Sequence, residues 1–243
     1  DVFGRRFESR LVPDGTIAPI APQRVKMVAK KIRWAREGPP DQNAAAEKDA
    51  EEAPSRRRLP PGQQRVTDWP VLDLGHQPAV DHRDFRLTVG GLVDRPFAWD
   101  WDAFSAQATV DSVSDIHCVT AWSRFDNRWR GLPTTALLAA AQPKSTARFV
   151  MVKSHDGYAT NLPIAALQAP DGLIATHWDD APLTRAHGGP ARLVLPQLYF
   201  WKSAKWVRQF WFMDRDAPGF WEARGYHPIG DPWREERTGP PSA

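Results

Sequence analysis

The stretch from residue 187 to residue 206 reads HGGPARLVLPQLYFWKSAKW, and it decides how the rest of this chain is interpreted. It combines His187, Arg192 and two lysines with a pair of glycines. Glycine lets backbone amides approach a ligand closely, and cationic side chains form charge-assisted hydrogen bonds to anions. The stretch predicts a site for a phosphate or another anion. Considered alone, it fits a solvated basic loop equally well.

A second stretch, DIHCVTAWS at residues 115–123, contains the single cysteine of the chain, Cys118, at the end of a predicted strand. One cysteine excludes an intramolecular disulfide and any cysteine-rich zinc or iron–sulfur site. A lone cysteine is more often a small buried apolar residue than a reactive group. The predicted anion-binding stretch at 187–206 favours a chemical role for Cys118.

Several common enzyme classes lack their sequence signatures here. The chain has no G-x-G-x-x-G, Walker, G-x-S-x-G or H-E-x-x-H motif, which argues against nicotinamide, nucleoside-triphosphate, ordinary hydrolase and zincin chemistry. No apolar run approaches the roughly 20 residues that span a bilayer. The pair Arg5-Arg6 is followed by LVPDG rather than by the apolar region of a signal peptide, so we expect a cytoplasmic protein.

The N-terminal quarter differs in charge from the remainder. Residues 1–66 contain 14 Lys and Arg against 9 Asp and Glu, within a chain whose net charge is +3. Apolar residues between Val25 and Ala35 recur at helical spacing among cations, which predicts a basic amphipathic helix. The helix could pack on the body or on an oligomer mate, or face an acidic partner or anionic surface. We divide the chain into an extension and linker, 1–62, and a domain, 63–243.

The domain shows strands and short helices without a regular βαβ alternation, which predicts an α+β fold. Short helices are expected at 99–104 and 134–141. Strands are expected at 85–89, 113–118, 149–152, 173–176, 192–195 and 206–213.

Four ordered motifs carry a resemblance to a known family: HCVTAWS at 117–123, DGYATN at 156–161, YFWKSAKW at 199–206 and PGFWEARGYH at 218–227. With His-Gly-Gly-Pro-Ala-Arg at 187–192, the chain resembles the sulfite-oxidase-type molybdopterin-binding proteins. It is most similar to their cytoplasmic sulfite-oxidase-like oxidoreductases. The resemblance implies the sulfite-oxidase molybdopterin-binding fold, with mixed β-sheets and short helices, and a molybdenum-molybdopterin cofactor. Every matched motif follows Pro60, so removal of residues 1–58 is expected to leave the redox centre intact.

The resemblance also implies site residues. Cys118 would be the sulfur ligand of molybdenum, and a soft thiolate suits that metal. Ser154 and Asp156 are alternatives for one polar contact. The residues implied to contact the pterin or its phosphate are His76, Ser154, Asp156, His187, Arg192, Ser203, Ala204 and Lys205.

The substrate site departs from the sulfite oxidases of the family. Their sulfite-binding arginine corresponds to Leu74 here, and Arg124, six residues after Cys118, is the cation we expect to orient a substrate. Tyr226 and His227 are further pocket candidates. The resemblance implies two-electron, oxygen-atom-transfer chemistry on a small molecule, a sulfur oxyanion or an S-oxide, with an unidentified protein donating or accepting electrons.

Two other classes stay open at this point. One is a Cys118-dependent thiol enzyme or hydrolase with a histidine base, which would contain no molybdenum. The other is a non-catalytic anion-binding module led by the basic helix and Arg56-Arg57-Arg58, which would bind in a steeply salt-dependent way. We expect no specific nucleic-acid partner.

Overall fold

The computed structural model describes residues 22–37 and 58–239. Neither range contains a helix that is long and apolar enough to cross a membrane. The helices are α2 (Pro22–Glu37), α4 (Trp101–Ser105), α5 (Thr134–Ala141) and α6 (Ile164–Leu167), with 3-10 turns η3 (Arg185–His187), η4 (Phe200–Lys202) and η5 (Glu222–Arg224). The strands are β1 (Gln64–Arg65), β2 (Leu87–Gly91), β3 (Phe97–Trp99), β4 (Val110–Cys118), β5 (Trp122–Pro133), β6 (Phe149–Ser154), β7 (Ala159–Pro163), β8 (Leu173–Trp178), β9 (Ala181–Pro182), β10 (Arg192–Val194) and β11 (Val207–Met213).

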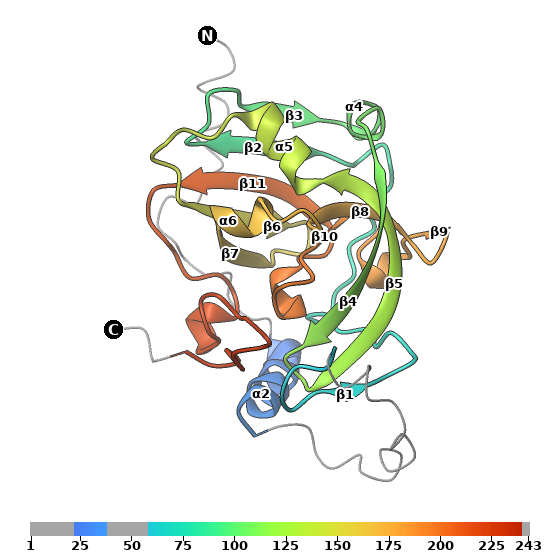
Figure 1. Ribbon diagram of the computed structural model, residues 1–243, viewed down its shortest axis with the longest axis vertical. Helices are drawn as coiled ribbons and strands as arrows, with labels where there is room; N and C mark the ends of the chain where they lie inside the picture. The colour runs from blue at the N-terminus through green and yellow to red at the C-terminus, as the bar shows by residue number, and fades with distance from the viewer. Residues whose placement is uncertain (1–21, 38–57, 240–243) are drawn as a thin grey trace.

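The strands form two mixed sheets, which Figure 1 shows as an upper-left sheet and a taller sheet on the right. One sheet follows the order β3-β2-β11-β6-β7, and β2 and β11 pair in parallel. In the other, the order is β1-β5-β8-β10, with β4 added beside β5 and β9 beside β8. Mixed sheets with short helices agree with the α+β prediction.

The long strand β5 was not predicted from the sequence, and its buried residues show why. Its inward-facing side chains include Ser123 and Asn127, both fully buried, which interrupt the apolar alternation expected of a strand. Asn127 is satisfied because its amide donates to the carbonyls of Ser114 at 3.1 Å and Arg124 at 2.9 Å. Pairing with β4 and β8 then fixes the strand.

Helix α2 packs against the body of the protein, one of the arrangements that the sequence left open. Val28 and Ala35 are each only 3% exposed and belong to the same core cluster as Cys118 and Tyr226. The Tyr226 hydroxyl donates to the Lys31 carbonyl at 3.1 Å. In Figure 1 the blue helix lies at the lower end of the molecule, near the C-terminal segment. The helix therefore shares a core with residues that the sequence division assigned to a separate domain, while most of the predicted linker lies outside the described residues.

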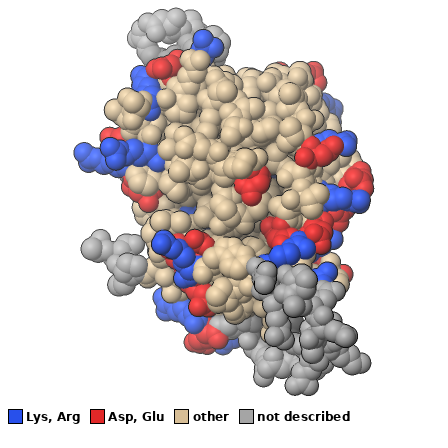
Figure 2. Space-filling view, viewed as in Figure 1, with Lys and Arg blue, Asp and Glu red and all other residues tan. Residues whose placement is uncertain are grey.

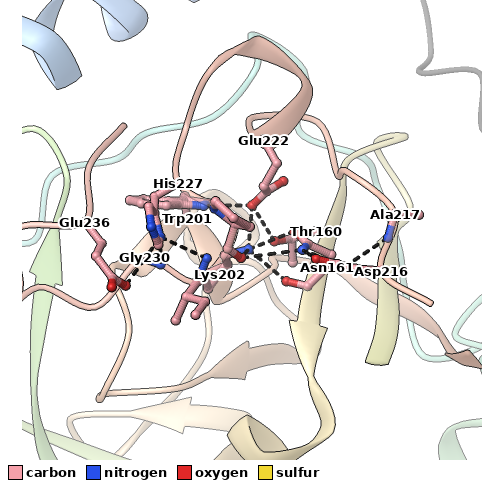
Figure 3. Close-up of polar contacts among 12 residues, drawn as sticks. Thr160, Asn161, Trp201, Lys202, Asp216, Ala217, Glu222, His227, Gly230 and Glu236 are labelled. Atoms are coloured by element: carbon pink, nitrogen blue, oxygen red, sulfur yellow. Dashed lines mark hydrogen bonds and ion pairs between the residues drawn. The ribbon is translucent and has the colours of Figure 1, made fainter. Parts of the chain in front are cut away.

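The C-terminal segment is joined to η4 and β7 by a buried ion pair, drawn in Figure 3. The Lys202 ammonium lies 2.7 Å from a Glu222 carboxylate oxygen, and both side chains are almost fully buried. Lys202 also donates to the Asn161 side-chain oxygen at 2.9 Å and to the carbonyls of Asn161 and Pro228. Lys202 therefore finds its counter-charge and its hydrogen-bond acceptors inside the protein.

Candidate functional site

Residues 187–192 and 203–206 lie side by side because the backbone between them folds tightly. Gly188 has φ +104°, and a Cβ there would lie 2.9 Å from Lys205 Cβ and 3.1 Å from Arg192 Cβ. A side chain at Gly188 would therefore both strain the backbone and push these segments apart. The Trp206 amide donates to the Gly188 carbonyl at 3.3 Å, and the Leu193 amide donates to the Ala204 carbonyl at 2.8 Å.

A cavity opens beside these segments and contains, with its mouth, about 790 Å³ of space outside the protein atoms. Seven of the predicted site residues line it: Cys118, Ser154, Asp156, Arg192, Ser203, Ala204 and Lys205. Tyr226, a weaker candidate from the sequence, lines the cavity as well, whereas its neighbour His227 is turned towards Glu236, 3.3 Å away. The aromatic side chains of Trp69, Trp201 and Trp221 form much of the wall.

Cys118 stands at the end of β4, where a tight turn leads into β5. The turn is held by the Ala121 amide, which donates to the Cys118 carbonyl at 3.0 Å, and by the Gln63 side chain, which donates to the same carbonyl at 3.0 Å. The Cys118 sulfur lies 3.1 Å from the Thr120 hydroxyl oxygen. Burial raises the pKa of the thiol, while the Thr120 hydrogen bond and the charges of Lys31 and Arg237 oppose that rise. A metal ion would deprotonate the thiol by binding its sulfur.

Arg192 is fully buried without a carboxylate partner among the described residues. Its guanidinium donates to the carbonyls of His187 at 2.9 Å and Ser203 at 2.8 Å, and it lies over the rings of Trp69 and Phe200. Burial lowers its pKa to about 9. The side chain therefore keeps a positive charge at neutral pH in surroundings that would favour an anionic ligand.

Lys205 is similarly placed. Its ammonium donates to the Ala186 carbonyl at 2.6 Å, and it makes no salt bridge within the ranges that the structure describes. Burial, followed by the charge of Arg192, lowers its pKa to about 7, although Asp73 and Asp156 partly compensate. An anion in the cavity would raise this pKa again and stabilise the ammonium.

His187 does not line the cavity directly but supports its wall. Its ring stacks on Trp69 with centroids 3.9 Å apart. Burial, and then the charges of Arg192, Lys205 and Arg124, lower its pKa to about 4, so the ring is neutral at pH 7. Its buried Nδ1 has no hydrogen-bond partner in the described part of the chain, and neither does the Ser154 hydroxyl.

Besides His187, two further predicted residues are absent from the cavity lining. Arg124 is held outside by Asp179, at 3.0 Å, by the Asn127 side chain and by the ring of Trp178. Because these groups already satisfy its charge, the expected substrate contact of Arg124 finds no support. His76 is exposed on the loop that follows Leu74 and is likewise absent from the cavity lining.

Sequence reasoning missed Lys31 and Trp69, which both line the cavity. Neither belongs to a motif, and Lys31 lies on the helix that was assigned to the extension. The sequence signal for Trp69 was the high number of tryptophans, 12 in this chain, which does not say which of them line a cavity.

The residues of the cavity fit a molybdopterin cofactor on several independent points. A pterin with a phosphate is anionic and flat, and the cavity offers buried cations, aromatic walls and, at the Ser154 hydroxyl, a buried polar atom without a hydrogen-bond partner among the described residues. The Cys118 sulfur faces the same space and supplies a soft ligand for molybdenum.

Comparison with known proteins agrees with this fit. The family described as "Oxidoreductase molybdopterin binding domain" matches residues 74–221. The uncharacterized oxidoreductase YuiH of Bacillus subtilis (strain 168) is 43% identical over 181 residues, which cover 74% of this chain and 91% of YuiH. The putative protein-methionine-sulfoxide reductase subunit YedZ1 of Azospira oryzae is 31% identical over 62% of this chain and 57% of its own length.

A solved structure extends the likeness to the fold. The sulfane dehydrogenase SoxCD from Paracoccus pantotrophus has a TM-score of 0.54 and 18% identity, covering 75% of this chain and 57% of that one. At this identity the likeness concerns the fold, and it confirms the sulfite-oxidase-type fold predicted from the motifs. The chain belongs to the oxidoreductase molybdopterin-binding domain family and is a molybdenum-dependent oxidoreductase whose cofactor is molybdenum-molybdopterin.

Proposed function

We propose that Cys118 is the protein's sulfur ligand to molybdenum and that the surrounding residues hold the pterin. The observation that carries the proposal is the meeting of Cys118, Arg192 and Lys205 in one cavity, with both cations lacking a carboxylate partner in the described ranges. Cys118 is far in the sequence from Arg192 and Lys205, which share one short stretch. Together they offer a soft metal ligand and a binding site for an anion.

Different residues of the chain would bind different parts of the cofactor. Lys205 and the backbone of Ser203 and Ala204 would bind the phosphate, with Arg192 behind them. Ser203 is well fixed because its hydroxyl accepts a hydrogen bond from the Leu195 amide at 2.9 Å. Ser154, whose buried hydroxyl lacks a partner in the described chain, would contact a polar edge of the pterin.

The bound cofactor supplies two-electron redox chemistry of the oxygen-atom-transfer type. The protein would exclude bulk water with Trp69, Trp201 and Trp221 and would keep nearby phenols neutral. Tyr158 donates to the Trp201 carbonyl and burial raises its pKa, so it remains protonated at neutral pH. The neutral phenols leave the charge of the cavity to its lysines, its arginine and the carboxylates of Asp73 and Asp156.

The substrate class we propose is a small sulfur oxyanion or S-oxide. Support comes from the relatives named protein-methionine-sulfoxide reductases, among them MsrP of Ralstonia nicotianae, 25% identical over 153 residues. This chain spans 46% of that protein and 57% of YedZ1, so their whole activities are not transferred. Because both are named as subunits, we also propose that a separate protein exchanges electrons with this centre. A cytoplasmic location remains a proposal from sequence alone.

The thiol-enzyme alternative finds less support. A cysteine nucleophile needs a base within hydrogen-bond reach. The polar side-chain partner of the Cys118 sulfur in the described ranges is Thr120, and the neighbouring His117 ring bonds to the Ser123 hydroxyl at 2.8 Å instead. Burial raises the Cys118 pKa, which opposes thiolate formation without a metal.

The distribution of charge on the surface argues against the alternative of a non-catalytic anion-binding module. On the face drawn in Figure 2, Lys and Arg lie beside Asp and Glu, and the coloured residues form no extended patch of one sign. Nucleic-acid binding typically uses a basic stripe. The exposed residues Lys26, Lys30 and Arg33 on α2 leave an acidic partner as a narrower proposal.

The proposed function is tested by metal analysis and pterin fluorescence on protein from a molybdopterin-competent host. We expect molybdenum and pterin in equal amounts. Methionine sulfoxide with a reduced viologen, and sulfite with ferricyanide, should distinguish the two substrate classes. Active protein without molybdenum would contradict the proposal.

A further inference from the structure

Helix α2 forms part of the cavity wall. Val28 and Ala35 anchor its inner face in the core, and the Tyr226 hydroxyl bonds to the Lys31 carbonyl. Tyr226 itself lines the cavity. The helix is therefore fixed at Lys31, the residue of α2 that lines the cavity.

The Lys31 ammonium is only partly satisfied by the protein. It donates to the Asp73 carbonyl at 2.5 Å. The Asp73 carboxylate is engaged elsewhere, accepting hydrogen bonds from the Gly75 amide at 2.7 Å and the Gln77 side chain at 2.8 Å. An ammonium carries three donors, so two of them find no acceptor in the described part of the chain. These donors are available to a ligand.

Lys31 is also a cation whose charge acts on Cys118. Lys31 and Cys118 line the same cavity, and the charges of Lys31 and Arg237 both oppose the rise of the Cys118 thiol pKa. Arg237, however, is bound to the backbone: its guanidinium donates to the carbonyls of Val119 at 2.6 Å and Pro61 at 3.3 Å, and it lies over the Tyr199 ring. Of these two cations, Lys31 is the one that lines the cavity with free donors.

We propose that Lys31 binds an oxyanion beside Cys118. A half-buried ammonium with spare donors gains from a tetrahedral or planar oxyanion, because charge-assisted hydrogen bonds replace the hydration that it has lost. This proposal rests on the proposed function, since the space beside Cys118 is where a metal-bound oxyanion substrate would lie. The phosphate of the cofactor is a second source of the same chemistry, and the test separates the two.

The test uses the oxidised holoenzyme and sulfate, a tetrahedral dianion, as the probe. Molybdenum and pterin contents are measured first, and sulfate binding per molybdenum is then measured by titration calorimetry. Lys31→Met is compared with wild type, with Lys31→Arg, which keeps the charge, and with Lys26→Met, an exposed lysine of the same helix.

We expect Lys31→Met to retain its cofactor and to bind sulfate roughly ten- to a hundredfold more weakly, with partial recovery in Lys31→Arg and no change in Lys26→Met. Loss of pterin and molybdenum with unchanged sulfate affinity per remaining metal would support an oxyanion contact but identify it as the cofactor phosphate. Unchanged cofactor content together with unchanged or undetectable sulfate binding would overturn the proposal. Wild-type protein without molybdenum would instead refute the proposed function.

Discussion

Two groups of buried cations in this protein are stabilised in different ways. Lys202, beneath η4, meets the Glu222 carboxylate at 2.7 Å and the Asn161 side chain at 2.9 Å (Figure 3). Arg192 and Lys205, a few residues away in the sequence, donate hydrogen bonds only to backbone carbonyls among the described residues. The first region is complete within the protein. In the second region neither cation makes a salt bridge among the described residues, which favours binding of an anion in the cavity.

The difference has an energetic meaning. An ionised side chain loses its hydration on burial, and several kcal/mol are lost unless a partner offsets the cost. The lowered pKa values of Arg192, about 9, and Lys205, about 7, record this cost in the cavity. For Lys202, burial also lowers the pKa, but the Glu222 charge opposes the change. The candidate binding site is thus marked by cations that make no salt bridge among the described residues.

The largest expected effect is on stability, from Lys202→Met. This change leaves the Glu222 carboxylate buried without its partner, which typically costs about 3–5 kcal/mol. Denaturant unfolding of cofactor-free protein measures the loss, with the exposed Lys144→Met as control. In the same assay Lys205→Met should change the unfolding free energy little or raise it. Equal destabilisation by Lys202→Met and Lys205→Met would remove the distinction between the two regions.

Removal of residues 1–58 is the next test, and here the structure reverses the expectation from sequence. The truncation deletes Lys31 from the cavity and Val28 from the core, and a buried aliphatic side chain of this kind contributes about 1.5–3 kcal/mol. We expect loss of cofactor, measured as molybdenum per protein. Removal of residues 1–21 alone, which keeps α2, serves as the control. Full molybdenum content after the longer truncation would restore the original division at residue 62.

A smaller effect is expected from Lys205→Met on cofactor retention. The change removes one charge-assisted contact, worth about 1.5–3 kcal/mol, or roughly ten- to a hundredfold in affinity. Pterin content after dialysis under dilute conditions should fall accordingly. Lys153→Met, a partly buried lysine on β6 outside the cavity, should retain as much pterin as wild type. If both variants lose pterin equally, Lys205 has no special role.

The pH dependence of anion binding sharpens the comparison further. Because the Lys205 pKa lies at about 7, its ammonium is present below that pH and is lost above it. Sulfate binding to cofactor-free protein should therefore weaken by up to about tenfold per pH unit above pH 7. Titration calorimetry between about pH 6 and about pH 9, a range that includes this pKa, measures the sulfate affinity. In Lys205→Met the affinity should depend less on pH. A pH-independent wild-type affinity would contradict the assigned charge state.

Local sequence patterns predicted the elements whose signals are local. The helix expected at 134–141 is α5, Thr134–Ala141, and the strand expected at 149–152 is the start of β6. The strand β5 was missed because two of its buried residues, Ser123 and Asn127, are polar and interrupt the apolar alternation. Their hydrogen-bond partners include residues of other segments, which the local sequence does not show. Such a strand is specified by its neighbours rather than by its own alternation.

The sequence predicted those residues of the site that belong to recognisable motifs. Cys118, Arg192 and Lys205 belong to ordered motifs and meet in the cavity, as the resemblance implied. Their individual roles stay predictions until tested. Lys31 could not be found in this way, because its position depends on how α2 packs against residues that are far away in the sequence. Arg124 illustrates the opposite failure: its spacing from Cys118 looked suitable, but Asp179, close to it only in the fold, satisfies its charge.

The most direct test of the account is molybdenum X-ray absorption of wild-type protein and of Cys118→Ser. The Cys118 sulfur lies in the cation-lined cavity, so the account predicts one sulfur ligand fewer at molybdenum in the variant. Pterin should be retained at least in part, because the cationic contacts remain, and redox turnover should be lost. An identical sulfur coordination in the two proteins, or wild-type turnover by Cys118→Ser, would contradict it.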